Sequence, residues 1–249
     1  MSKRLLLAGL LGLAWFALSG FKVGGINLDK AVEAGADAYT AATLSEKDIQ
    51  AMGKQSADEL DKLNKIAPAS NAYAKRLDKI ISGLHKEDGL KLNFKVYLVR
   101  DVNAFALPDG SVRVFAGLMD LMTDDEIYFV IGHEIGHVKN GDSADAYRVA
   151  YAASAARKGA GAAGGTAAAL SASQLGDLGE AVVNAQFSQS QESAADRYGL
   201  QLMKKYKKNT AAAVSALNKL AALGSSGGFL SSHPDSKDRA KALEALRNK

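Results

Sequence analysis

The segment that most constrains the fold of this chain is residues 133–137, which read His-Glu-Ile-Gly-His. On an α-helix, two residues four positions apart lie on one face, one turn from each other. The two imidazoles can therefore reach the same point, while Glu134 stands about 100° around the helix, beside that point. Apolar neighbours such as Val130 and Val138 indicate that the helix is embedded in a core. The segment thus predicts a buried helix with two metal-ligating side chains and a carboxylate placed to take a proton from metal-activated water.

Composition narrows what else such a site can contain. The chain has no cysteine, which excludes a disulfide framework, Cys-ligated zinc, an iron–sulfur cluster and a Cys nucleophile. His133 and His137 are two of only four histidines, and a third protein ligand must be His, Asp or Glu. Glu192 and Asp196 are one turn apart on a predicted helix. One carboxylate of such a pair can bind the metal, and the other can accept the free N–H of a ligating histidine. The alternative is an ordinary helix with scattered acids, so the residues alone leave the third ligand open.

The first twenty residues have the three-part pattern of a secretory signal. Lys3 and Arg4 precede an uncharged apolar run at 5–18, and the small residues Ser19 and Gly20 follow. The run is shorter than the roughly 20 apolar residues of a spanning helix. Phe21 stands where a lipoprotein would need cysteine. Two outcomes stay open: cleavage after Ser19, or retention of residues 1–20 as an N-terminal anchor.

Hydrophobic periodicity predicts an α+β, mainly α-helical protein with a small sheet. We expect strands at 94–100, 104–107 and 112–115, with the last two joined by a Pro-Asp-Gly turn at 108–110. We expect helices at 26–66, 69–86, 124–139 after a capping box at 123–126, 177–206, 210–223 and from 235 onward. Residues 224–228 should form a loop.

An Ala- and Gly-rich segment lies at 152–172, where 15 of 21 residues are one of these two types. Glycine lowers helix stability by about 1 kcal/mol each, so one interpretation is a small-residue hairpin or a mobile flap. The other interpretation is a lid over the site, because the segment falls between the two helices that would supply metal ligands.

Four motifs occur in a fixed order around this site. His-Glu-Ile-Gly-His is followed about 55 residues later by Glu-Ser-Ala-Ala-Asp at 192–196, and then by His233-Pro234 with Arg239. The fourth motif is an upstream stretch that contains Asn-Ala-Phe-Ala-Leu-Pro-Asp-Gly at 103–110 and Gly-Leu-Met at 117–119. Over roughly residues 70–245 the chain resembles the HtpX and CAAX-prenyl-protease type of zinc metallopeptidase, and most of all its soluble periplasmic members of the LoiP and BepA kind.

The resemblance implies a zincin-like fold of the gluzincin type and assigns a role to each matching position. His133, His137 and Glu192 would hold one zinc ion, with Glu134 as catalytic base. Asp196 would support a ligand from one turn away. His233 and Arg239 would lie near the substrate and stabilise the oxyanion, and the strand at 103–107 would hold the substrate chain. The sequence departs from the family at Gln189, where an Arg is usual, and at Ala194, where a Glu is usual.

The expected domain order is a signal or anchor at 1–20, an N-terminal helical segment at 26–68 and, from the resemblance, a zinc metallopeptidase domain at 69–249. The implied function is a zinc-dependent endopeptidase of the bacterial periplasm or cell envelope that hydrolyses unfolded or misfolded envelope or outer-membrane proteins, with the N-terminus as a route to membrane association. One alternative is a non-enzymatic periplasmic chaperone or assembly factor that retains the metal site, and another is a zinc hydrolase of a non-peptide bond. The net charge of +4 is not gathered in a basic stripe, so we expect no nucleic-acid partner.

Overall fold

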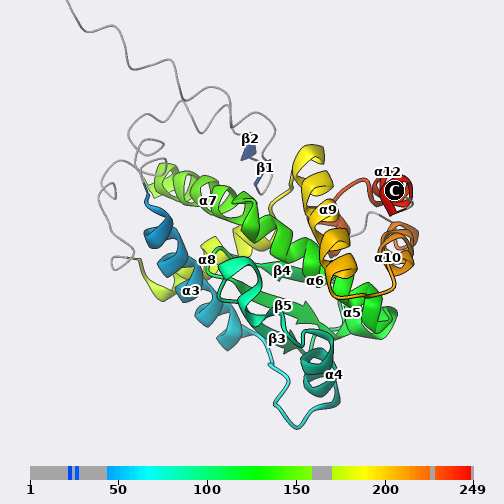
Figure 1. Cartoon of the computed structure of the whole chain (residues 1–249). Coiled ribbons are helices and arrows are strands. Elements are labelled where there is room, and N and C mark those ends of the chain that lie inside the picture. The colour runs from blue at the N-terminus through cyan, green and yellow to red at the C-terminus, as the bar shows by residue number, and fades with distance from the viewer. Residues whose placement is uncertain (1–21, 24–25, 28–43, 159–169, 225–227, 248–249) are drawn as a thin grey trace, which may run out of the picture.

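The computed structural model describes residues 22–23, 26–27, 44–158, 170–224 and 228–247 (Figure 1). Its centre is a three-stranded sheet of β3 (Asn93–Tyr97), β4 (Ala104–Ala106) and β5 (Ser111–Phe115), in the order β3-β5-β4. The predicted hairpin is confirmed, because β4 pairs antiparallel with β5 across a turn in which Gly110 has φ +88°. β3 pairs parallel with β5, which leaves β4 at one edge of this sheet.

The sheet lies between two layers of helices, and its two faces belong to two apolar clusters. Val96, Ala104 and Val114 face α6 (Asp124–Lys139) and join its Ile127 and Ile131 in the larger cluster. On the opposite face, a second cluster joins side chains of the sheet to α3 (Glu46–Leu63), α7 (Asp142–Lys158) and α8 (Ala172–Val183). A strand buried on both faces explains why β4 reads as an apolar run rather than as an alternating one.

Helix α3 is tied to the sheet by a buried ion pair. Arg113 of β5 is 2% exposed and donates from Nε and Nη2 to Asp61 of α3, at 2.8 and 3.0 Å. Tyr97 and Lys95 of β3 donate to the same carboxylate at 2.7 and 2.6 Å. Nearer the start of α3, Gly53 faces the β4–β5 turn. The predicted N-terminal helical segment therefore contains a helix that shares a core with the sheet.

Helices α6 and α9 (Gln189–Lys205) pack against each other at very short range. A Cβ on Gly136 would lie 3.0 Å from the Cα of Ala195, and one on Gly132 would lie 3.0 Å from the Cα of Gly199. Helix α6 begins at the predicted capping box, in which Thr123 and Glu126 satisfy each other's backbone N–H groups. It ends at Asn140, and Gly141 with φ +84° leads directly into α7.

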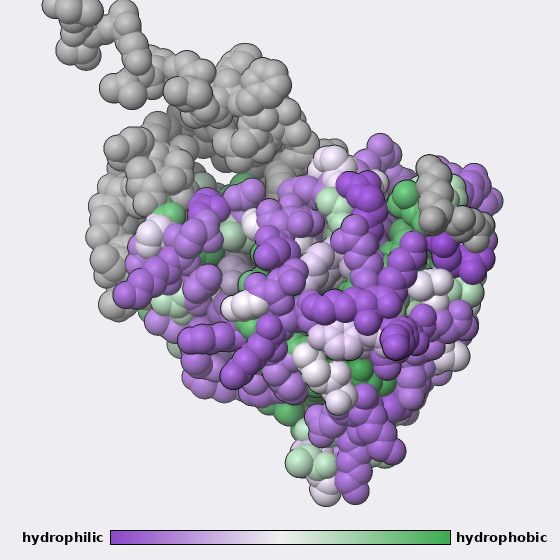
Figure 2. All heavy atoms as spheres, in the orientation of Figure 1, coloured by the Kyte–Doolittle hydropathy of each residue, from purple (hydrophilic) through white to green (hydrophobic). Residues whose placement is uncertain are grey.

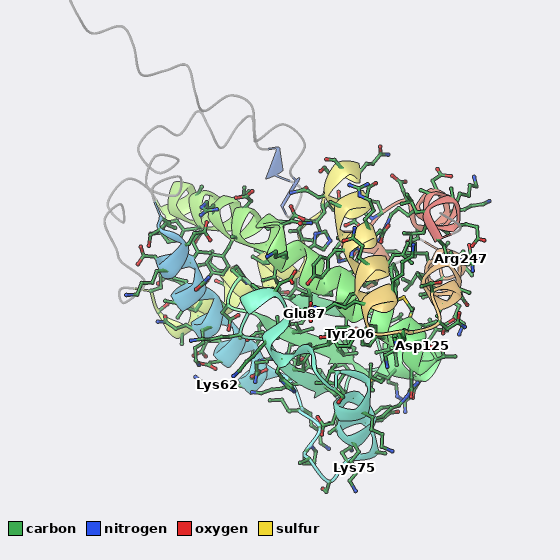
Figure 3. All side chains as sticks on the ribbon, viewed as in Figure 1. Lys62, Lys75, Glu87, Asp125, Tyr206 and Arg247 are labelled. Carbon is green, nitrogen blue, oxygen red and sulfur yellow. The ribbon has the colours of Figure 1, made fainter. Side chains whose placement is uncertain are left out.

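The remaining helices surround this pair. They are α4 (Ala72–Ile80), the 3₁₀ helix η1 (Leu84–Gly89), α5 (Ala116–Leu121), α10 (Ala211–Ala222), α11 (Phe229–Ser232) and α12 (Ser236–Arg247). In Figure 3 the labelled Glu87 of η1 and Tyr206 at the end of α9 lie close together, and the Tyr206 hydroxyl donates to the Glu87 carboxylate at 2.6 Å. Figure 2 shows a mostly hydrophilic face with only scattered apolar patches.

Three of the predicted helices were wrong in extent. The helix expected at 69–86 is α4, which ends at Ile80, followed by the separate 3₁₀ helix η1. The helix expected at 177–206 is two helices, because α8 ends at Asn184 and a new capping box of Ser188 and Gln191 starts α9. The helix expected from 26 begins instead with a short antiparallel pair, β1 (Lys22–Val23) and β2 (Ile26–Asn27). A Gly-Gly pair between β-branched residues is a two-residue hairpin signal that the surrounding helical periodicity obscured.

Four predictions fall wholly or partly outside the described residues. Residues 28–43 of the helix expected at 26–66, and 225–227 of the loop expected at 224–228, lie outside them. Residues 1–20 are not described. Of the Ala- and Gly-rich segment, 152–158 belong to α7, 172 begins α8, and 159–169 are outside the description. No helix in the described part of the chain combines the length and apolarity needed to cross a bilayer.

Candidate metal centre

Four buried side chains from three separate stretches of chain converge on one point. His133 and His137 come from α6, Glu192 from the first turn of α9, and His233 from the residue that ends α11. One potential ligand atom from each lies within 4.8 Å of all the others. None of the four is more than 2% exposed. The two residues that the motif placed on one helix face thus meet a carboxylate 55 or more positions further along the chain.

The facing atoms are arranged as a metal would require. His133 Nε2 and His137 Nε2 are 3.1 Å apart, and Glu192 Oε1 is 3.4 Å from His137 Nε2. The opposite ring nitrogens are engaged elsewhere: His133 Nδ1 lies 2.9 Å from Asp196 Oδ1, and His137 Nδ1 lies 2.8 Å from Asp142 Oδ2. A carboxylate can only accept, so both Nδ1 atoms carry the proton when the rings are neutral and both Nε2 lone pairs point inward. Two nitrogens and one carboxylate oxygen match the ligand set of a catalytic zinc site.

The pKa values of the two motif histidines shift in opposite directions. Burial lowers the pKa of His133 to about 3, against the attraction of Glu192 and Asp196. Burial also lowers the pKa of His137, but hydrogen bonds to Asp142 and Glu192 outweigh it and raise the value to about 9. The raised pKa of His137 means that a proton competes with a metal for its Nε2, because a ligating imidazole is neutral.

Glu134 points beside the cluster, as its position on the helix predicts. It is 2% exposed, and its Oε1 lies 3.4 Å from His233 Nε2 without a hydrogen-bond partner among the described residues. Burial raises the pKa of its carboxyl above the ordinary value, ahead of the opposing attraction of His233 and His137. A carboxylate whose proton affinity is raised is suited to accept a proton and give it back.

Arg239 lies behind the carboxylates of Glu192 and Asp196. It donates from Nε and Nη2 to Asp196 at 2.8 and 2.7 Å, and its Nη1 contacts Glu192 Oε2. Burial raises the pKa of Asp196, but Arg239 and His133 outweigh it and lower the value to about 2. The structure therefore brings Arg239 to the site, against Asp196 and Glu192, where it neutralises the two acids.

Two phenylalanines enclose His233. The ring of Phe229 stacks on it at 4.2 Å between centroids, and Phe187 stacks at 5.3 Å. Phe187 also stacks on His137, at 4.0 Å and 16° between planes. Phe187 lies in the break between α8 and α9, which was not predicted, so its approach to the site was not predicted either.

Asp142 was not predicted as a site residue. Its signal was an acidic residue five positions after the second motif histidine.

All seven predicted site residues thus lie together: His133, Glu134, His137, Glu192, Asp196, His233 and Arg239. A mainly helical domain with a small sheet, in which this motif lies on a buried helix and meets a carboxylate from a second helix, is a zincin-like metallopeptidase.

Comparison with known proteins places the chain more narrowly. It belongs to peptidase family M48, whose sequence profile matches residues 67–247. It is 43% identical to the metalloprotease YcaL of Escherichia coli over 222 residues, which are 88% of this chain and 87% of that protein. It is also 43% identical to the E. coli metalloprotease LoiP, over 85% of each chain. A shorter match, 38% identical, covers 30% of this chain and 29% of a protease HtpX homologue from Sulfurovum. The chain is therefore a metalloprotease, as the motifs predicted.

Proposed function

We propose that this chain is a zinc-dependent endopeptidase that hydrolyses unfolded or misfolded proteins of a bacterial cell envelope. The observation that carries the proposal is the convergence of His133, His137 and Glu192 with Glu134 beside them. When bound there, zinc would act as a Lewis acid that activates water and polarises a carbonyl. Glu134 takes the proton of the attacking water and passes it to the leaving amine.

His233 has two possible roles at this site, and zinc affinity distinguishes them. Its Nε2 lies 3.4 Å from Glu134 Oε1, which suits a donor to the oxyanion. Its Nδ1 faces the ligands, 3.2 Å from His133 Nε2, which suits a fourth ligand. We assign it the donor role, because a catalytic site keeps one position open. His233→Ala should then slow hydrolysis and leave zinc affinity unchanged, whereas a loss of zinc affinity would make His233 a ligand.

The edge strand β4 supports an extended polypeptide as substrate. The backbone carbonyl of Asn103 accepts from Phe115 N–H, and Leu107 N–H donates to the carbonyl of Ser111, so the residues on either side of β4 pair with the β5 strand. Ala104 and Ala106 therefore direct their backbone groups away from β5. Ala104 N–H is taken by the Asn103 side chain at 2.9 Å. The groups that remain would add a substrate strand through its backbone, without selecting a sequence. Both alanines are buried, so an incoming strand must displace neighbouring side chains.

The decisive experiment compares hydrolysis of unfolded casein by the wild-type chain, by Glu134→Gln and by Glu180→Gln. Glu180 is an exposed residue of α8 and serves as the matched control. We expect Glu134→Gln to retain zinc and lose about 10²–10⁴-fold in rate, and Glu180→Gln to match wild type. Chelation should abolish activity and zinc should restore it. A wild-type chain that holds zinc and hydrolyses no polypeptide would favour the chaperone or assembly factor instead.

The envelope location rests on the pattern of residues 1–20. Expression of the full chain in a bacterium, followed by fractionation and N-terminal sequencing, tests it. A periplasmic chain that begins at Gly20 would establish cleavage after Ser19, and an intact chain in the membrane fraction would establish an anchor. An intact chain in the cytoplasm would contradict the proposed location.

A further inference from the structure

Each of the two motif histidines, and not only the first, has a buried carboxylate behind it. Asp196 accepts from His133 Nδ1, at 2.9 Å. Asp142 lies 2.8 Å from His137 Nδ1 through its Oδ2 and is 6% exposed. It is the first residue of α7 and follows Gly141, whose positive φ turns the chain sharply after α6. This turn returns the Asp142 carboxylate to a ring five residues upstream.

The contact determines which atom of His137 faces the other ligands. Stacking on Phe187, at 4.0 Å and 16°, fixes the plane of the imidazole. A flip of the ring by 180° about its bond to Cβ would preserve that plane and turn carbon atoms toward Glu192. The hydrogen bond from Nδ1 to Asp142 holds the ring from its outer side, and the contacts of Nε2 with Glu192 and His133 lie on the inner side. The hydrogen bond to Asp142 also places the proton on Nδ1 and so leaves Nε2 free to bind a metal.

We propose that Asp142 is a positioning residue that fixes the orientation and tautomer of His137 for zinc, as Asp196 does for His133. The inference rests on the proposed zinc site. Buried partners of this kind typically contribute about 10–100-fold in metal affinity. Asp142 has no direct contact with the point where the metal would lie, so its effect reaches zinc only through His137.

A helix-start role is the competing explanation, since acidic residues in the first turn of a helix favour its dipole. The chain offers a matched control for it. Asp145 lies in the same first turn of α7, but its side chain is 55% exposed and pairs with Arg148 at 2.8 Å. Asp145→Asn removes the same charge from the same turn of the helix without touching the site. A helix-dipole effect would lower the stability of both variants equally.

The experiment measures zinc affinity by competition with a chromophoric chelator, using the full chain as wild type, Asp142→Ala, Asp142→Asn and Asp145→Asn. We expect Asp142→Ala to bind zinc about 10–100-fold more weakly. Asp142→Asn, which keeps an accepting oxygen, should lose less, and Asp145→Asn should match wild type. The absorption spectrum of the cobalt-substituted protein should change for Asp142→Ala only, because one ligand is displaced.

Thermal unfolding of the zinc-free proteins separates positioning from folding. If Asp142 only positions His137, all four proteins should be folded before heating and should unfold on heating. If Asp142→Ala fails to fold, Asp142→Asn keeps the side-chain volume and carries the test. Unchanged zinc affinity in the folded Asp142 variants, or an equal loss in Asp145→Asn, would overturn the inference. Affinity does not depend on hydrolysis, so a chain that shows this series without peptidase activity would refute the proposed function alone. A wild-type chain without zinc affinity would overturn both.

Discussion

The short approach of α6 to α9 makes a strong prediction for Gly136→Ala. The new Cβ would lie 3.0 Å from Ala195 Cα and 3.2 Å from Ala195 O, inside the 3.4–4 Å of ordinary contact. Both neighbours are helix backbone and cannot rotate away, so α9 must shift by a few tenths of an ångström. Glu192 lies one turn earlier on α9 and must move with it. The substitution should therefore weaken folding and metal binding together.

The expected size follows from two opposing terms. Overpacking a well-packed contact costs about 1–3 kcal/mol. Replacing glycine by alanine inside a helix returns about 1 kcal/mol. The zinc-free variant should thus lose about 0–2 kcal/mol, and its melting temperature should fall by about 2–4 °C for each kcal/mol lost. Strain that reaches Glu192 weakens zinc binding about tenfold for each 1.4 kcal/mol.

Two other helical glycines separate these effects. Around Gly176 of α8, a Cβ would meet nothing nearer than Glu59 Cβ at 4.0 Å, so Gly176→Ala should stabilise the fold by about 1 kcal/mol. A Cβ on Gly179 would lie 3.0 Å from Leu60 Cδ1, in the contact with α3. Gly179→Ala should therefore destabilise the fold while leaving zinc affinity unchanged.

The assay is thermal unfolding of the three zinc-free variants together with chelator competition for zinc. Only Gly136→Ala should lose zinc affinity. The reasoning fails if Gly136→Ala gains stability as Gly176→Ala does and binds zinc as tightly as wild type, because α9 would then have accommodated the methyl group without moving Glu192.

Further predictions concern the buried charges and the metal. Asp61→Ala leaves the buried Arg113 without its carboxylate partner and should lower the free energy of unfolding by about 3–5 kcal/mol in urea titrations. Asp58→Ala removes an exposed ion pair and should lower the free energy of unfolding by less than about 1 kcal/mol. In the zinc-free protein, the pKa of Asp196 is lowered from 3.8 to about 2, so about 2 kcal/mol of stability is present above pH 4 and is lost as the pH falls toward 2. Replacing Arg239 by Met should remove much of this acid dependence, and its persistence would assign the dependence to other groups. Zinc at about 1,000 times its dissociation constant should stabilise the wild type by about 4 kcal/mol, while magnesium, which prefers oxygen ligands, should not.

Local signals predicted the elements around the site well. The Thr123 capping box and the Pro-Asp-Gly turn each depend on residues within four positions of one another, and both are present in the structure. The parallel pairing of β3 with β5 was not predictable, because alternation along a strand says nothing about its partner. The break at 184–188 did have a signal, the Ser-x-x-Gln of a second capping box, but continuing helical periodicity on both sides concealed it.

The residues of the site likewise divide into those that a local pattern predicts and those that depend on packing between helices. The motif alone indicated His133, Glu134 and His137, because their spacing is fixed by helix geometry. Glu192 was left open by the residues and was indicated by the family resemblance. The approach of Asp142 and the stacking of Phe187 depend on how separate helices meet in three dimensions, which no local pattern encodes.

His133 and His233 meet across 100 residues of chain. Contacts between residues so distant in sequence form late in folding, whereas a hairpin such as β4–β5 closes within microseconds. The β4–β5 hairpin is therefore expected to form well before the candidate metal centre is assembled. The candidate metal centre is complete only when α9 and α11 have packed against α6.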